Sequence, residues 1–470
     1  MDGAVYCKGK SIRPLVVSSQ GKRESRIEAC NDSARQQGIR PGMTVSAARG
    51  LVGDLQVLSR NEDAERNTLK HLAAWAGQFT PMVNLATSRD LLLEVAGSLT
   101  FFGGKEALLR RVRDGLHDLG HQTTIALAPT PLAAVWLAGA GQEPCITDPT
   151  QLTKHVLRLP LKVLGLKERQ RATLVGMGLR CIGDCLRLSR HGLARRLGPE
   201  LLKMLDQALG RIPDPKVPYA PPQRFFSRLL LPAEVVQVAA LLFAVRRLVL
   251  ELCGALRGRN SGVQELHLQL IHQAQAVTEI QLRLIAPGHD APHLLGLLQE
   301  RLRSIRLPAP VRELLLSSSE FVPLASCSRD WITQGNTESE QWTELIERLQ
   351  ARLGKDAVHG LCQIAEHRPE KAWRFCAPRE KRSDYFSSPF PARPLWLLPE
   401  PTVLEMHGDR PYLDGDLIFE YERERIESGW WNSADVARDY FIARNPQGAR
   451  FWIYRQLRGT QRWFLHGIFG

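Results

Sequence analysis

Cysteine is the first residue type in this chain whose spacing could support chemistry, through metal coordination or disulfide formation. The sequence has nine cysteines, scattered from Cys7 to Cys376 without a Cys-x-x-Cys pair. The nearest two, Cys181 and Cys185, stand at helical i, i+4 spacing, and no second pair completes a tetrahedral zinc site. We therefore expect buried core thiols, with no disulfide, no structural metal and no cofactor.

Phosphate binding is the second chemistry that the residue pattern supports. Residues 150–222 hold 14 Lys and Arg against 5 Asp and Glu, a net charge of +9, in a region of helical periodicity. Glycine turns before helix starts can offer backbone N–H groups to phosphate, and nearby basic side chains add attraction that is independent of base sequence. The candidate contacts are Lys162, Lys167, Arg169, Arg171, Gly178, Arg180 and Gly183. The glycines could instead only cap the helices.

The overall composition limits the class of protein. The chain has 470 residues, of which 44% are hydrophobic, so wholesale disorder is excluded and several domains are expected. A net charge of +13 favours nucleic acid or another polyanion as partner, although a merely basic protein stays possible. No apolar stretch approaches the ~20 residues that span a bilayer, and the start lacks the apolar core of a signal peptide. The expected location is the cytoplasm, at the nucleoid.

The elements that must position these residues begin with an α/β pattern over residues 12–140. We predict strands over 15–19, 90–96 and 123–128, a helix entered near Glu28, and a turn over 38–42. Alternating elements of this kind predict a layered sheet with helices packed on it. A proline-rich linker over 213–222 follows the basic helical region.

Residues 223–331 predict a second sheet. Their order is strand, long helix, two strands, helix and strand, and this β-α-β-β-α-β order favours an open sheet with both helices on one face. The net charge there is +3, from 12 Lys and Arg against 9 Asp and Glu. A helical connector over 332–375, a proline-rich tether over 376–403 and a small aromatic β domain over 404–470 complete the chain.

Two segments resemble motifs of the Y-family translesion DNA polymerases. Residues 33–43, with the pair Ala34 and Arg35 before a glycine-rich turn, resemble the fingers motif of that family. Residues 92–98, followed by Phe-Gly-Gly at 102–104, resemble the palm strand and its turn. The resemblance implies palm and fingers in residues 1–150, a helix-hairpin-helix thumb in 151–212 and a little finger in 223–331. In that little finger, Arg257 and Arg259 would face DNA or lie in a solvated loop.

The catalytic position departs from the family pattern. Active members begin the palm strand with an Asp-Glu pair that helps to hold two Mg²⁺ ions, and here the aligned residues are Arg89 and Asp90. Asp32 replaces the tyrosine of the fingers, and the first palm strand, which carries another aspartate, would precede Ser11. The resemblance therefore implies a polymerase-fold protein that is not an enzyme. An active low-fidelity polymerase with carboxylates from other positions stays an alternative, and so does Asp90 as an ordinary strand end.

The C-terminal residues resemble the ImuB family, a non-catalytic branch of the Y-family, through landmarks at 367–370, 393–399, 425–431, 438–441 and 463–467. That resemblance implies a subunit that joins DNA, the sliding clamp, a RecA-like partner (ImuA) and an error-prone C-family DNA polymerase in damage-induced mutagenesis. The expected clamp contacts are Arg393, Leu395, Trp396 and Leu397. The expected partner-binding face holds Arg425, Trp430, Trp431, Tyr440, Phe441 and Trp463. Two alternatives stay open: these aromatics fill a compact core, or the protein is a scaffold that does not touch DNA.

Overall fold

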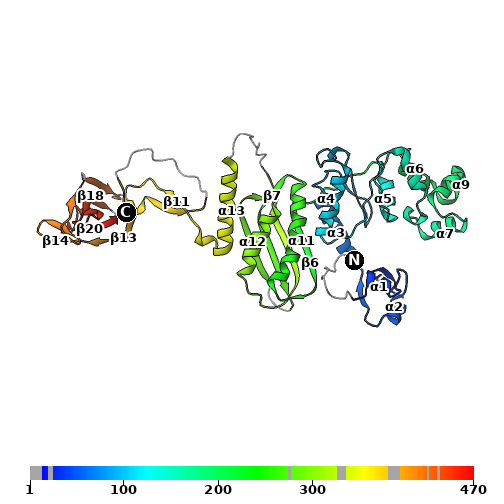
Figure 1. Cartoon of the computed structure of the whole chain (residues 1–470), viewed down its shortest axis with the longest axis horizontal. Coiled ribbons are helices and arrows are strands. Elements are labelled where there is room, and N and C mark those ends of the chain that lie inside the picture. The colour runs from blue at the N-terminus through cyan, green and yellow to red at the C-terminus, as the bar shows by residue number, and fades with distance from the viewer. Residues whose placement is uncertain are drawn as a thin grey trace. The chain divides into compact units, whose positions relative to one another are not determined.

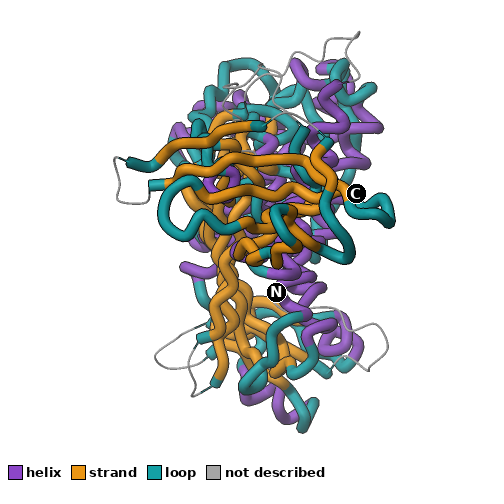
Figure 2. Tube along the Cα trace, turned by 90° about the vertical axis from the view of Figure 1, so that its left-hand side faces the viewer, coloured by secondary structure: helices purple, strands orange, loops and turns teal. Residues whose placement is uncertain are grey.

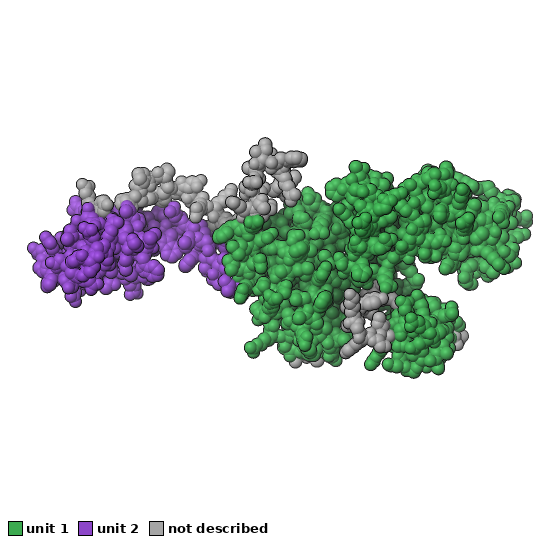
Figure 3. Space-filling view, viewed as in Figure 1, with its two compact units in different colours: residues 1–352 green, residues 353–470 purple. Residues whose placement is uncertain are grey.

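The computed structural model describes residues 13–19, 25–273, 277–324, 335–378, 392–420, 423–430 and 435–470. The chain divides into two compact units, residues 1–352 and 353–470 (Figure 3). In the described ranges, no helix combines the length and the apolar character that crossing a membrane requires.

The first unit begins with a small three-stranded sheet. Strand β1 (Leu15–Ser18) lies between antiparallel β2 (Ile27–Cys30) and parallel β3 (Gln56–Ser59). Helices α1 (Asp32–Gln36) and α2 (Val45–Leu51) cover it. The prediction that a helix begins near Glu28 was wrong. Ile27 and Cys30 belong to strand β2 and are buried in the core, and helix α1 begins only after its N-cap, Asn31.

The next elements form a helical layer with one short hairpin. They are α3 (Glu62–Ala76), β4 (Val83–Leu85), β5 (Leu91–Leu93), the 3₁₀ turn η1 (Ala96–Ser98) and α4 (Lys105–Asp118). The strand predicted over 123–128 does not form, because its only β contact is an isolated bridge between Leu127 and Cys145. The expected layered sheet is therefore two separate small sheets.

The basic helical region shares one core with helix α5 (Pro131–Gly139), which the sequence pattern placed in the preceding α/β region. Its elements are α6 (Pro149–Leu157), η2 (Leu161–Leu164), α7 (Glu168–Gly176), α8 (Ile182–Arg187), α9 (Arg190–Leu197) and α10 (Pro199–Ala208). The proline-rich linker that follows is held in place, since the Tyr219 N–H donates to the Val83 carbonyl at 2.7 Å beside β4.

An antiparallel sheet domain follows in the order that the sequence predicts (Figures 1 and 2). Its elements are β6 (Arg224–Val235), α11 (Val238–Arg257), β7 (Ser261–His272), β8 (Thr278–Gly288), α12 (Ala291–Arg303) and β9 (Val311–Glu320), with the short β10 (Val322–Pro323) beside β7. The strand order is β8-β7-β9-β6. Helices α11 and α12 contact each other and share one apolar core with the sheet, which places them on the same face.

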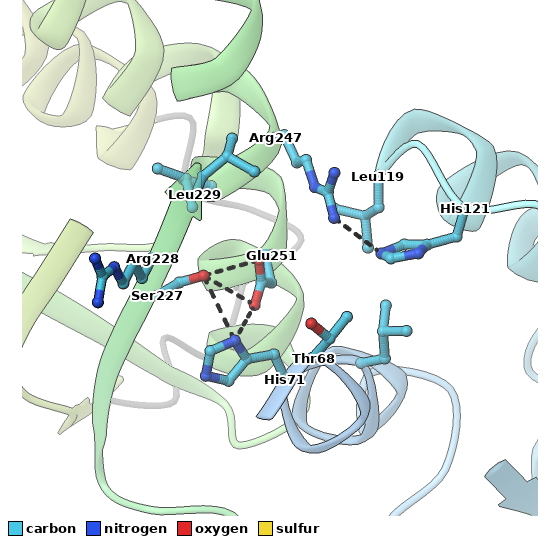
Figure 4. A pocket seen from close by; sticks show the side chains of 11 residues that line it. Thr68, His71, Leu119, His121, Ser227, Arg228, Leu229, Arg247 and Glu251 are labelled. Atoms are coloured by element: carbon cyan, nitrogen blue, oxygen red, sulfur yellow. Dashed lines mark hydrogen bonds and ion pairs between the residues drawn. The ribbon is translucent and has the colours of Figure 1, made fainter. Parts of the chain in front are cut away.

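Helix α11 of the sheet domain packs directly on α3. Gly254 faces the indole of Trp75, and Gly115 of α4 meets the other edge of the same ring, so a Cβ at either glycine would clash with it. Beside this contact, His71 lies 2.9 Å from the Glu251 carboxylate, which also accepts a hydrogen bond from Ser227 at 3.3 Å (Figure 4). The cavity there is about 40 Å³, which is room for roughly one or two waters and not for a nucleotide.

Helix α13 (Gly335–Leu353) ends the first unit. Ile346 and Ala351 are buried, and the Glu347 carboxylate accepts from the Ile285 N–H at 2.6 Å and pairs with His293 at 2.6 Å. This end of the predicted polar connector is thus fixed to α12 and β8.

The second unit begins with a short hairpin that corrects one expectation. Strand β11 (Gly360–Gln363) pairs with β12 (Trp373–Cys376), flanked by η3 (Lys355–Ala357) and η4 (Pro369–Lys371). Cys362 and Cys376 form a disulfide with their Cα atoms 6.0 Å apart, so the expectation of no disulfide was wrong. Only the pairing of the two strands brings these thiols together.

Residues 404–470 are rich in β-strands, as the sequence predicts, and most of these strands form one sheet. Its strands are β13 (Trp396–Val403), β16 (Ile418–Phe419), β17 (Glu424–Ser428), β18 (Val436–Arg444), β19 (Arg450–Gln456) and β20 (Trp463–Ile468), and a hairpin of β14 (Glu405–His407) and β15 (Arg410–Tyr412) lies beside them. Its path is β13-β20-β19-β18-β16. The proline-rich tether was predicted to reach residue 403, but residues 396–403 form the edge strand β13.

Candidate nucleic-acid interface

Arg89 and Asp90 lie in the turn before β5. The Thr87 hydroxyl donates to the Asp90 carboxylate at 2.5 Å and accepts from the N–H groups of Arg89 and Asp90, each at 3.1 Å. The Arg89 guanidinium lies 3.8 Å from the Glu28 carboxylate of β2. The Asp90 carboxylate is therefore hydrogen-bonded within its own turn, and Arg89 belongs to a group of ion pairs.

That group is centred on Arg60, which follows β3. Its guanidinium pairs with Glu28 at 2.8 Å and Glu65 at 2.9 Å, and Glu62 lies 3.5 Å away. The hydrogen bond from Arg60 lowers the pKa of Glu65, and the same bond raises the pKa of Arg60. The carboxylates nearest to Arg89 are thus neutralised by guanidinium groups. Within the described residues, no cluster of three or more His, Cys, Asp or Glu could hold a metal ion.

The fingers-like segment places Asp32 beside Arg35 on α1. Their side chains pair at 3.4 Å and are both exposed, while Ala34 between them is buried. The turn after α1 uses Gly38 and Gly42, both with positive φ, as the glycine-rich pattern predicts. Asp32 therefore partly neutralises the arginine of the fingers-like pair.

The predicted phosphate contacts of the basic helical region are exposed. Lys162, Lys167, Arg169 and Arg180 all reach solvent, and we define them as the basic set. Arg171 is also exposed but pairs with Glu168 at 2.8 Å, which raises the pKa of the arginine. Arg171 therefore offers less attraction to phosphate than the basic set does.

The glycine turn at 178–183 serves the fold. Gly178 adopts φ +77°, a conformation that favours glycine, and a Cβ at Gly183 would lie 3.0 Å from the Leu157 carbonyl of α6. The Asp184 carboxylate accepts from the N–H groups of Arg180 at 2.9 Å and Cys181 at 3.1 Å, and these bonds lower its pKa. The N–H groups of Arg180 and Cys181 are therefore not available to phosphate.

The two arginines predicted at the sheet domain differ. Arg257 is exposed at the end of α11. Arg259 donates to the carbonyls of Pro221 and Pro222 and lies 5.6 Å from the centre of the Phe321 ring. Burial lowers its pKa. The Arg259 guanidinium thus anchors the proline-rich linker.

Three outward arginines of the sheet domain form ion pairs that the sequence did not predict. Arg224 pairs with Glu320 at 2.6 Å, Arg283 pairs with Glu265 at 3.0 Å, and Arg228 pairs with the buried Glu313. Each pair joins two strands that are neighbours in the sheet. Composition alone could not show that these charges are neutralised.

The residues of the candidate clamp segment differ in exposure, because the edge strand β13 begins within it. Leu395 is 90% exposed and Trp396 is 66% exposed, whereas Leu397 packs against the buried cluster around Tyr440. Arg393 pairs with Glu424 and lies 4.7 Å from the centre of the Trp452 ring. Leu395 and Trp396 are therefore the two residues of this set that can reach a partner.

The aromatic set of the C-terminal sheet also divides. Tyr440 is 1% exposed and stacks on Trp452, so its assignment to a binding face was wrong, because its ring fills the core. Phe441 and Trp463 are half-buried and lie 5.4 Å apart, while Trp430 is 77% exposed. Arg425 pairs with Asp439 at 2.8 Å. Trp431 lies outside the described residues.

The landmark at residues 367–370 has a structural role that the sequence did not reveal. Arg368 is buried and pairs with Glu366 at 2.6 Å, and Glu366 also accepts from Ser428 of β17. Mainly through the bond from Arg368, the pKa of Glu366 falls to about 2. Glu370 pairs with Arg438 of β18 at 3.2 Å. These contacts attach the segment before β12 to the C-terminal sheet.

Comparison with known proteins gives matches over most of the chain. The impB/mucB/samB family model matches residues 10–138. Protein ImuB of Caulobacter vibrioides (strain NA1000 / CB15N) is 27% identical over 463 residues, covering 92% of this chain and 100% of that protein. DNA polymerase IV of Pseudomonas fluorescens (strain Pf0-1) is 27% identical over 194 residues, covering 40% of this chain and 54% of that protein. The solved structure of DinB from Sulfolobus solfataricus aligns with a TM-score of 0.37 at 16% identity, covering 66% of this chain and 93% of that one.

Residues 10–138, which match the impB/mucB/samB family model, are followed by a basic helical region and an antiparallel sheet domain. The similarity to DNA polymerase IV covers 40% of the chain, and the similarity to ImuB covers 92%. The chain is an ImuB-like protein.

Proposed function

We propose that this protein is a DNA-binding subunit of damage-induced translesion synthesis that does not itself polymerise nucleotides. The observation that carries the proposal is the surroundings of Arg89, which pairs with Glu28 next to Arg60 at the position that aligns with catalytic carboxylates. Nucleotide transfer by two metal ions needs carboxylates free to bind Mg²⁺, whereas here Glu28 and Glu65 pair with Arg60 and Asp90 accepts a hydrogen bond from Thr87.

DNA binding is assigned to the basic set, with Arg257 as a further contact. These cations are exposed on a region of net charge +9, and the sheet domain contributes less, because Arg224, Arg228 and Arg283 pair with carboxylates. Binding of this kind is electrostatic and independent of sequence. A scaffold that avoids DNA would have no use for such a concentration of charge.

Primer extension tests the catalytic part. The purified protein with a primed template, four deoxynucleotides and Mg²⁺ or Mn²⁺ should give no product, under conditions in which DNA polymerase IV of Pseudomonas fluorescens extends the primer. Extension by the wild type, whether or not Asp90→Ala abolishes it, would contradict the proposal. Loss of the product in Asp90→Ala would favour the alternative of an active low-fidelity polymerase, which the similarity to DNA polymerase IV supports.

The proposed partners are the sliding clamp, an error-prone C-family DNA polymerase and a RecA-like ImuA protein. The similarity to ImuB and the exposure of Leu395, Trp396 and Trp430 in the second unit support this assignment. Exposed tryptophan and leucine side chains are common anchors of protein interfaces.

Truncation after Arg352 tests the partner assignment, because it removes the whole second unit. No sheet of the described residues is cut by this truncation, since strands β11 to β20 pair only with one another. We expect loss of clamp and polymerase association in a purified pull-down, with DNA binding intact. Full retention of every partner would rule out a recruiting role for this unit.

A further inference from the structure

The β11–β12 hairpin presents one exposed apolar face. The register places Leu361 opposite Phe375 and Gln363 opposite Trp373, so these four side chains share a face of the two strands. Leu361 is 63% exposed, Phe375 61% and Trp373 47%. Cys362 and Cys376 point to the other face, where both are buried and joined as a disulfide. One face of the hairpin is therefore buried and joined by the disulfide, and the other face is exposed to solvent.

The open face carries aromatic rings in a row. The centroids of Trp373 and Phe375 are 5.4 Å apart, and His359 lies 5.0 Å from Phe375 on its other side. Rings left exposed on alternate residues of one strand gain nothing for the fold itself, and a contiguous apolar patch of this kind marks a binding surface.

The charges around the face are mainly positive. Lys355 and Lys371 are exposed in this segment, while Arg374 lies opposite Cys362 on the other face of the hairpin. Of its carboxylates, Glu366 pairs with Arg368 and Glu370 pairs with Arg438, which leaves Asp356 as the exposed acidic side chain in residues 354–377. Exposed rings with cations beside them complement a ligand that has flat apolar groups and a negative backbone.

We propose that this face is a stacking platform for the unpaired bases of single-stranded DNA. Bases can stack on Trp373 and Phe375 while Lys355 and Lys371 attract the phosphates, and such stacking tolerates any base. The inference rests on the proposed function in taking DNA as the ligand. The platform is separate in the chain from the basic set, and it recognises bases where the basic set recognises charge.

Competitive binding to three probes tests the platform. The full-length protein, without reductant, is titrated with a fluorescein-labelled oligo(dT) of about 20 nucleotides, an abasic oligomer of the same length, and a duplex. Wild type should bind oligo(dT) at least about tenfold more tightly than the abasic oligomer, and Trp373→Ala with Phe375→Ala should abolish that preference. Duplex binding should not change. Trp373→Phe with Phe375→Tyr, which keeps both rings, should retain the preference.

Controls separate stacking from other causes. Trp342→Ala removes an exposed tryptophan on α13 and should leave all three affinities unchanged. Replacing the basic set by glutamate should weaken duplex binding but keep the ratio between oligo(dT) and the abasic oligomer. If the alanine pair binds oligo(dT) as wild type does while duplex binding is normal, the inference is overturned and the proposed function stands. A change of oligomeric state in place of the lost preference would also overturn it. Failure of wild type to bind any probe would overturn both.

Discussion

The indole of Trp75 fills the space that Gly254 leaves open on α11. A Cβ at residue 254 would overlap the ring, and a Cβ at Gly115 would overlap its opposite edge. Farther along the same helices, a Cβ at Gly258 would lie 2.6 Å from the Gly77 carbonyl carbon. Two helices far apart in sequence thus approach closely because glycine occupies these two points of contact. The sheet domain is held on α3 by this approach and by the pair of His71 with Glu251.

Replacing Gly254 by valine tests that contact. Overpacking against Trp75 should cost about 1–3 kcal/mol and should increase hydrogen exchange in α3 and α11. Gly296→Ala is the matched control, because nothing lies within 4 Å of its Cβ in α12, and it should be neutral or stabilising by about 0.5–1 kcal/mol. Adding Trp75→Ala to Gly254→Val should cost less than the two changes summed. Simple additivity would show that the two residues do not interact.

Charge reversal of the basic set should weaken binding to any duplex. Each lost phosphate contact reduces the slope of log Kobs against log salt by about 0.9, so the four changes together should reduce it by about 3–4. Fluorescence anisotropy at several salt concentrations measures the slope. Arg224→Gln with Arg283→Gln is the control, since both arginines pair with carboxylates, and it should change the slope by less than about 1. Equal effects of the two variants would argue against the basic set.

The stability of the C-terminal sheet should depend on His466. Burial lowers the pKa of His466 to about 4, and its Nδ1 is hydrogen-bonded to the Tyr440 hydroxyl at 2.8 Å. The unfolded chain protonates this histidine near pH 6.5, so the sheet is fully stable above that pH and loses up to about 1.4 kcal/mol per pH unit as pH falls towards 4. Hydrogen-exchange protection of residues 451–470 should therefore fall between pH 7 and pH 5. His407→Gln, an exposed control, should keep this dependence, and His466→Gln should remove it.

Docking of α13 should show the opposite dependence. The hydrogen bond to Glu347 raises the pKa of His293 above its usual value. The pair therefore stabilises the helix fully below about pH 6.5, and this contribution disappears as pH rises through the raised pKa. Protection of residues 341–353 should be greater at pH 6 than at pH 9, after correction for intrinsic exchange rates. His293→Gln should make protection equal at the two values, and a slope that persists in this variant would contradict the assignment.

The clamp segment should separate into binding and folding residues. Leu395→Ala with Trp396→Ala should reduce affinity for the sliding clamp at least tenfold without lowering the unfolding midpoint, because both side chains point to solvent. Leu397→Ala should instead destabilise the sheet by about 1–3 kcal/mol, because Leu397 packs against the cluster of Tyr440 and Trp452. Surface plasmon resonance and thermal unfolding measure the two effects. Unchanged clamp affinity in the first variant would exclude the segment.

Local pattern was enough to predict much of the chain. Alternation and helical periodicity predicted the element order of residues 223–320 correctly, because each strand and helix there buries one regular face. The aromatic C-terminal strands were predicted for the same reason. The unusual pair of Arg89 and Asp90 could be read from the sequence, since it depends only on the identity of two adjacent residues.

Pairing across the fold decided what local pattern could not. Whether an arginine is free or neutralised depends on its neighbour in space, as with Arg259 on the proline-rich linker and Arg283 beside Glu265. The same holds for the disulfide of Cys362 with Cys376, for the burial of Tyr440 and for the division of residues 393–397 by an edge strand. Sequence determines which groups are present and which way a regular element faces, but charge neutralisation, thiol pairing and exposure are set by distances between residues far apart in the chain, which only the tertiary structure decides.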